Sequence, residues 1–132
     1  MIIGIGSDVV DIRRVERLLE RYGARFAERI LTPFERAQVT SSVDFASYVA
    51  GRFAAKEALA KAVGTGLRHP VTWQNMEVRP DAMGRPHLHV SDELRRAVGR
   101  ASLRIHLSLT HDAGIALAMV VVEQTSDDGP VS

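Results

Sequence analysis

Apolar residues recur along the chain with two different periods, and these periods divide its first third into a strand and helices. Residues 2–10 alternate loosely and are rich in β-branched side chains, so they predict a strand. From Ile12 onward the apolar residues follow at helical spacing, at Val15, Leu18, Leu19, Tyr22 and Phe26. Gly23 interrupts this pattern and is expected to break or bend the helix.

The middle of the chain predicts a short helix followed by the longest one. Thr32-Pro33 has the form of a helix cap followed by proline in the first turn, and it opens a short helix to Val39. The long helix runs from about Asp44 to Val63 and contains an alanine-rich stretch of strong helix formers. Gly64-Thr65-Gly66 is expected to end it.

The last third of the chain alternates again and predicts strands joined by short turns. A hairpin is expected from residues 73–78 and 86–90, and Ser91 is the expected N-cap of a helix to about Val98. Two further strands, residues 103–109 and 115–123, flank a turn at residues 111–114. Short connections favour antiparallel pairing of these strands.

One α+β domain accounts for this order of elements, because the chain shows neither a linker nor an internal repeat. We expect the domain to span residues 1–123. Residues 124–132 have a polar, turn-rich composition and predict a frayed, disordered tail.

Composition narrows the class of protein. With 132 residues, 45% of them hydrophobic and 25% charged, the chain is expected to be globular. Cysteine is absent, which excludes disulfides, a thiol nucleophile and thiolate metal sites, and fits a cytoplasmic location. The net charge of +1 argues against nonspecific nucleic-acid binding. No apolar run approaches the roughly 20 residues that span a bilayer, so we expect no membrane partner.

Three short motifs can carry chemistry, and each also has an ordinary structural interpretation. Gly4-Ile5-Gly6-Ser7-Asp8 leaves an aspartate at the end of a strand, where it could simply cap the next helix. Glu57 and Lys61 share one face of the long helix, where they could form an ordinary salt bridge. A magnesium site would require Glu57 to meet another carboxylate, because Mg²⁺ on a diphosphate takes one or two carboxylates plus waters.

The third motif is His106-Leu107-Ser108-Leu109-Thr110-His111-Asp112. Strand alternation places its residues 106, 108 and 110 on one face, and residues 105, 107 and 109 on the other. His111 is expected just past the strand, in a turn. It is either an ordinary surface histidine or a base that accepts a proton in its neutral form, with Asp112 beside it to orient it.

Taken together, the motifs occur in the order and at the spacing of the holo-acyl-carrier-protein synthases, which this chain resembles over residues 1–123. The matching segments are Gly-Ile-Gly-x-Asp at residues 4–8, Phe-Ala-Glu-Arg-Ile-Leu-Thr at 26–32, Arg-Phe-Ala-Ala-Lys-Glu-Ala at 52–58, Gly-Thr-Gly at 64–66, Gly-Arg-Pro at 84–86 and Ser-Leu-Thr-His-Asp at 108–112. The resemblance implies an antiparallel sheet packed against a long helix, one half of the pseudo-two-fold phosphopantetheinyl transferase fold. It also implies a homotrimer with each site between two subunits.

The implied activity is a Mg²⁺-dependent transfer of 4′-phosphopantetheine from coenzyme A to the serine of apo acyl carrier protein, in support of fatty acid biosynthesis. The roles that the resemblance implies fall on the motif residues. Asp8 and Glu57 match the two Mg²⁺ ligands, Lys61 matches a catalytic lysine on the coenzyme A phosphates, Gly64, Thr65 and Gly66 match a loop along the coenzyme, Pro86 matches a position near its adenine, and His111 matches a histidine close to the reaction and the coenzyme.

Docking of the acidic carrier protein is expected on the first helix. Arg14, Arg17, Arg21 and Arg25 recur at helical spacing, and Arg14 matches a basic position of the family, with Arg21 on the same stripe. The alternative is a solvated face balanced by Glu16 and Glu20. Two other functions also stay open at this point, a noncatalytic binding module for coenzyme A or the carrier protein, and a Mg²⁺-dependent phosphodiesterase.

Overall fold

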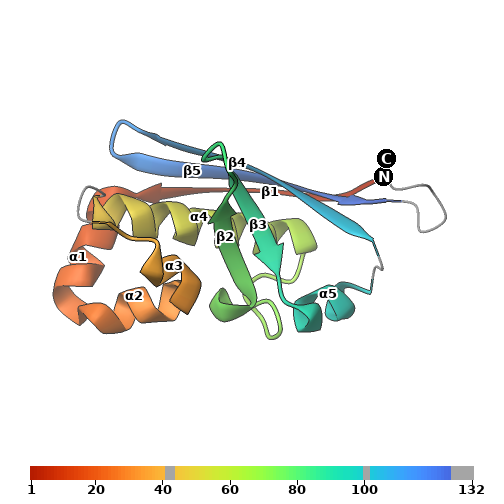
Figure 1. Cartoon of the computed structure of the whole chain (residues 1–132), viewed down its shortest axis with the longest axis horizontal. Coiled ribbons are helices and arrows are strands. Elements are labelled where there is room, and N and C mark those ends of the chain that lie inside the picture. The colour runs from red at the N-terminus through yellow and green to blue at the C-terminus, as the bar shows by residue number, and fades with distance from the viewer. Residues whose placement is uncertain (41–43, 100–101, 126–132) are drawn as a thin grey trace.

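The computed structural model describes residues 1–40, 44–99 and 102–125 and has an α+β architecture, which confirms the predicted fold class. Its elements are β1 (Ile2–Asp11), α1 (Ile12–Tyr22), α2 (Ala24–Ile30), α3 (Pro33–Ala37), α4 (Phe45–Val63), the short 3₁₀ helix η1 (Trp73–Asn75), β2 (Met76–Pro80), β3 (Pro86–Val90), α5 (Asp92–Val98), β4 (Leu103–Asp112) and β5 (Ile115–Gln124). A three-stranded antiparallel sheet has the order β1-β5-β4, and β2 and β3 form a hairpin. Figure 1 shows the helices on one side of the three-stranded sheet.

Strand β1 lies directly on the backbone of α4, because two of its residues are glycines. A Cβ atom on Gly4 would lie 1.9 Å from the carbonyl oxygen of Ala62, and one on Gly6 would lie 2.0 Å from that of Ala58. No side chain fits in either place. The helix contributes alanines to the same contact, and Ala54, Ala58 and Ala62 are buried. This close approach places the end of β1 beside the second half of α4.

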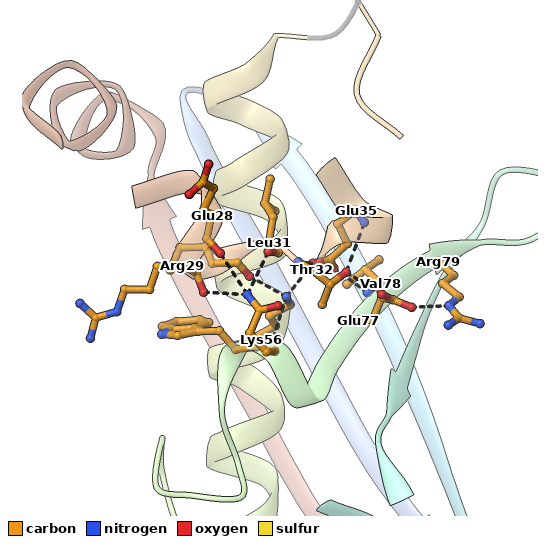
Figure 2. Close-up of polar contacts among 12 residues, drawn as sticks. Glu28, Arg29, Leu31, Thr32, Glu35, Lys56, Glu77, Val78 and Arg79 are labelled. Atoms are coloured by element: carbon orange, nitrogen blue, oxygen red, sulfur yellow. Dashed lines mark hydrogen bonds and ion pairs between the residues drawn. The ribbon is translucent and has the colours of Figure 1, made fainter. Parts of the chain in front are cut away.

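Helix α4 is also held by a buried network of polar groups around Lys56 (Figure 2). Its Nζ donates to Glu35 Oε1 at 2.7 Å and to the carbonyl oxygens of Ile30 at 2.6 Å and Trp73 at 3.0 Å. Glu35 accepts two more hydrogen bonds, from the backbone N–H groups of Thr32 and Val78. Both charged side chains are fully buried, so the network ties α4 to the α2–α3 connection, η1 and β2.

Most predicted elements form, with three differences. Trp73–Asn75 is a 3₁₀ turn and not a strand, because the Trp73 carbonyl accepts from Lys56 and the Asn75 N–H donates to Thr72. The short helix ends at Ala37, two residues before the predicted Val39. The prediction that His111 lies in a turn is wrong. The turn is the two-residue pair Ala113-Gly114, both at positive φ, so β4 continues through Asp112.

The predicted tail and the predicted break at Gly23 can also be compared with the structure. Gln124, the first residue of the predicted tail, belongs to β5, and residues 126–132 lie outside the described residues. Gly23 separates α1 from α2 as predicted, so Arg25 falls on α2 and not on the helix of Arg14. Among the described helices, none is long and apolar enough to cross a membrane.

Candidate active site

Strand β1 and helix α4 bring Asp8 and Lys61 into contact. Lys61 Nζ donates to Asp8 Oδ1 at 3.0 Å and to the carbonyl oxygen of Ser7 at 2.9 Å. The Asp8 side chain is 15% exposed and that of Lys61 is 53% exposed. The carboxylate is therefore largely enclosed, whereas the ammonium group is open to solvent and can reach a bound molecule.

Glu57 lies one turn before Lys61 on the same face of α4. Burial and the negative charge of Asp8 raise the pKa of Glu57, and the positive charge of Lys61 partly opposes this rise. Two carboxylates from different elements thus interact unfavourably. Such a pair of oxygen donors fits a hard divalent cation, which neutralises both.

In the part of the chain that the structure describes, this pair does not belong to a larger metal-binding cluster. Within the described ranges, no group of three or more His, Cys, Asp or Glu side chains could hold a metal ion. A cation held by Asp8 and Glu57 would need its remaining ligands from water or from a bound molecule. That requirement fits an ion that carries phosphate oxygens and not a closed structural metal site.

The predicted glycine loop ends α4 next to Lys61. Gly64 adopts the left-handed conformation at the helix C-cap, with φ of 92°. Its N–H and that of Gly66 both donate to the carbonyl oxygen of Ala60, at 3.1 and 3.2 Å. Thr65 Oγ1 donates to the Gly66 carbonyl oxygen at 2.9 Å. The loop is therefore fixed by its own backbone, and the exposed Thr65 faces solvent beside the end of the helix.

His111 lies apart from this group, on the opposite edge of the sheet. Asp8 is on β1 and His111 on β4, with β5 between the two strands. His111 contacts the first half of α4, where its Nε2 is 3.0 Å from the carbonyl oxygen of Ser47. It also touches Gly51, which precedes Glu57 by six residues and Lys61 by ten, rises of about 9 Å and about 15 Å along an α-helix. One chain therefore does not bring His111 to the two carboxylates.

Pro86 lies on the β2–β3 hairpin, and thus on neither of the elements that carry Asp8 and Lys61. It opens β3, and β3 packs against β4, the strand that carries His111. Asp112 does not orient the histidine, since neighbours on a strand point to opposite faces and the hydrogen bond of His111 goes to Ser47. Of the sequence-predicted site residues, Asp8, Glu57, Lys61 and the glycine loop thus form one group, whereas His111 on β4 and Pro86 on β3 lie on other elements.

Arg14 and Arg21 are exposed on α1. Close to them, Leu18, Tyr22, Arg25, Phe26 and Arg29 line a hollow of about 490 Å³ between α1 and α2. The Arg21 guanidinium lies over the Tyr22 ring, 5.3 Å from its centroid. In the described part of the chain, no ion pair joins Glu16 or Glu20 to these arginines. The surface therefore combines apolar side chains with exposed arginines that are not held in ion pairs by Glu16 or Glu20.

Gly51 received no role from the motifs, although it stands immediately before the Arg-Phe-Ala-Ala-Lys-Glu-Ala segment. A Cβ atom at this position would lie 2.7 Å from His111 Nε2 and 2.9 Å from its Cε1. A glycine inside a helix costs roughly 1 kcal/mol relative to alanine, so its presence in the middle of α4 was a signal of close approach.

Residues 4–119 match the model of the 4′-phosphopantetheinyl transferase superfamily. The chain therefore belongs to this superfamily. Its relatives include the holo-[acyl-carrier-protein] synthases of Nitrosospira multiformis, 46% identical over 94% of this chain and 100% of that one, and of Methylobacterium sp. strain 4-46, 47% identical over 97% and 98%. The resemblance that the motifs indicated is confirmed.

Solved structures give the same result for the fold. The holo-[acyl-carrier-protein] synthase of Neisseria meningitidis has a TM-score of 0.86 and 41% identity, with 94% of this chain and 100% of that chain covered. That of Bacillus anthracis, in complex with CoA (3′,5′-ADP), has a TM-score of 0.79 and 41% identity, with 95% and 99% covered. The phosphopantetheinyl transferase fold and enzyme class predicted from the sequence are confirmed.

Proposed function

We propose that this protein transfers the 4′-phosphopantetheine group of coenzyme A to the serine of an apo acyl carrier protein, releasing adenosine 3′,5′-bisphosphate. The reaction supports fatty acid biosynthesis and takes place in the cytoplasm. The observation that carries the proposal is the contact of Lys61 with Asp8, beside Glu57, at the open end of α4. Cleavage of a diphosphate depends mainly on positioning and on positive charge around the phosphate oxygens, and this group of residues can provide both.

Asp8 and Glu57 would hold Mg²⁺ in this site. When bound, the ion supplies positive charge to the diphosphate oxygens. Lys61 adds a second positive charge at the same place, because its exposed ammonium can exchange Asp8 for phosphate oxygens. Gly64, Thr65 and Gly66 follow directly and would line the path of the coenzyme, with Pro86 near its adenine.

A complete site requires a second copy of the chain. His111 and Pro86 lie at the β4 edge, whereas Asp8, Glu57 and Lys61 lie at the β1 side of α4. The sheet face that carries no helix is open, and on it β1 and β5 place the apolar side chains of Ile5, Val9, Leu117 and Met119, between 38% and 58% exposed. Such a face favours association of subunits. We therefore propose a homotrimer in which the β1 side of one subunit meets the β4 edge of the next.

Complementation between two impaired variants tests this arrangement. Asp8→Asn and His111→Ala proteins are each expected to lose most of their transfer activity alone. When the two are unfolded and refolded together, about a quarter of the sites in randomly mixed trimers should pair an intact Asp8 with an intact His111. The transfer activity of the mixture should therefore reach about a quarter of the parental activity. Light scattering should give the mass of a trimer. No gain in activity over the separate variants in a mixture proven to contain mixed trimers would contradict an interface site.

The arginine surface of α1 and α2 would receive the carrier protein. Carrier proteins are generally acidic, and Arg14 and Arg21 lie next to a hollow lined by apolar and basic side chains. Exposed charges of this kind act mainly on the association rate and its dependence on salt. The apolar floor of the hollow, formed by Leu18 and Phe26, would bury an apolar side chain of the partner.

Arg14→Glu is expected to raise the KM for the carrier protein much more than the KM for coenzyme A. The reason is repulsion of an acidic partner, and the effect should shrink with salt because exposed charges are screened over about 8 Å at physiological ionic strength. Steady-state kinetics at low and high salt measure both values. Arg96→Glu on α5 reverses an exposed charge elsewhere and serves as the control. If Arg14→Glu and the parent have equal KM values for the carrier protein at low salt, the arginine surface is only a solvated face and does not bind the carrier.

Mass spectrometry decides between this function and its two alternatives. Apo carrier protein is incubated with coenzyme A, Mg²⁺ and the enzyme. Transfer adds the mass of one phosphopantetheine group to the carrier and releases adenosine 3′,5′-bisphosphate. A noncatalytic binding module leaves both substrates unchanged, and a phosphodiesterase cleaves the coenzyme without modifying the carrier.

A further inference from the structure

His111 is held against α4 in one orientation. Its ring occupies the space that a side chain at position 51 would fill, since a Cβ atom on Gly51 would lie 2.7 Å from Nε2. The carbonyl oxygen of Ser47, one turn earlier on the helix, is 3.0 Å from the same nitrogen. Two features of the helix, a missing side chain and a carbonyl group, thus fix the ring.

The hydrogen bond to Ser47 determines where the neutral ring carries its proton. A carbonyl oxygen can only accept, so Nε2 must donate and therefore bears the hydrogen. The lone pair of the neutral ring is then on Nδ1, the nitrogen that does not face the helix. Protonation at Nδ1 leaves the Ser47 hydrogen bond intact, because Nε2 still donates in the imidazolium form.

We propose that Gly51 is a positioning residue that holds His111 with Nε2–H on Ser47 and presents Nδ1 to the serine of the carrier protein. This inference rests on the proposed function. As the serine oxygen forms its bond to the phosphorus of the phosphopantetheine phosphate, its proton passes to Nδ1. The phosphorus–oxygen bond to the leaving adenosine 3′,5′-bisphosphate breaks, and that product takes the electron pair.

Gly51→Ala tests the positioning role. The added methyl group must displace the ring, which is the end of a side chain and can move, so the fold is retained. Alanine also favours a helix over glycine by roughly 1 kcal/mol, so the thermal midpoint should not fall. We expect kcat to decrease about 10- to 100-fold through misplacement of the histidine, with the KM for coenzyme A unchanged.

The direct readout is the ¹⁵N NMR spectrum of the histidine rings, measured without substrates. At a pH that deprotonates the imidazolium form, the parent should show His111 in the Nε2–H form alone, and Gly51→Ala should show a mixture of the two neutral forms. The control is Gly99→Ala at the end of α5, where φ is 75°; it should lower the thermal midpoint but leave kcat and the His111 signals unchanged.

An Nδ1–H form in the parent would overturn the proposal. So would a Gly51→Ala protein with altered His111 signals and the parental kcat, because the orientation would then not serve the reaction. Failure of the proposed function gives a different result, since a parent protein without any transfer activity still reports the form of the His111 ring.

Discussion

Asp8→Asn and Glu57→Gln are each expected to slow phosphopantetheine transfer about 10²–10³-fold, corresponding to a loss of ~2.7–4 kcal/mol of transition-state stabilisation. Each change removes one negative oxygen donor from the pair that would hold Mg²⁺ while preserving the shape of the side chain. The loss should appear in kcat at saturating coenzyme A and should be largest at limiting Mg²⁺. Single-turnover transfer to apo carrier protein, followed by mass spectrometry, measures it.

Stability separates this loss from a folding defect. A carboxyl whose pKa is raised in the folded protein contributes stability that is present below its unfolded pKa and is lost as the pH rises through the folded pKa. For Glu57 the rise comes from burial and from Asp8, so Gln at this position should not lower the free energy of unfolding at neutral pH. Urea unfolding without Mg²⁺ tests this, with the exposed Glu16→Gln on α1 as control. Near-parental transfer rates for both site variants at limiting Mg²⁺ would remove the two carboxylates from the metal site.

The sequence predicted the elements well where local pattern decides them. The alternation of residues 2–10 and the alanine-rich run to Val63 are both long enough to distinguish a strand from a helix. Gly23 and Gly64 ended helices as glycines do, and Thr32 formed the expected cap. That Asp8 and Lys61 lie close together could be predicted only from the motifs taken together. Its physical cause, the contact of Gly4 and Gly6 with the backbone of α4, appears only in three dimensions.

Sequence pattern did not separate the two groups of site residues. A motif order along one chain does not say on which edge of a sheet each motif falls, and the order β1-β5-β4 depends on long-range pairing. Placing His111 in a turn failed for a local reason, because Ala113 takes the positive φ that the two-residue turn requires. Such a conformation is uncommon for alanine, so nothing in the residue type indicated it.

The buried side of α4 also escaped prediction. Lys56 and Lys61 are both lysines in an alanine-rich helix, and helical spacing alone gives no reason to bury one and expose the other. Lys56 is fully buried because three acceptors, from Glu35, Ile30 and Trp73, converge on its ammonium group. Lys61 does not contact these three acceptors and lies near the exposed end of the helix. The same substitution should therefore affect stability at Lys56 and transfer activity at Lys61.

Lys56→Met is expected to lower the free energy of unfolding by about 3–5 kcal/mol, because it leaves the Glu35 carboxylate buried without its cation. Burial lowers the pKa of Lys56, and the Glu35 charge opposes this, so the ammonium form depends on its partner. Lys61→Met breaks a pair whose ammonium group is half exposed to solvent, and should change stability by less than about 1 kcal/mol while it impairs transfer.

Urea unfolding at one fixed protein concentration compares the two lysine variants, because association in the proposed homotrimer would contribute to the apparent stability. Pairing Lys56→Met with Glu35→Gln removes both charges, so the double variant should be more stable than the sum of the two single losses predicts. The Glu35 amide cannot replace every hydrogen bond of the carboxylate, so part of the loss should remain. A Lys56→Met protein that unfolds at the parental urea concentration would show that the buried ion pair contributes nothing to the fold, and that packing around α4 holds the helix without it.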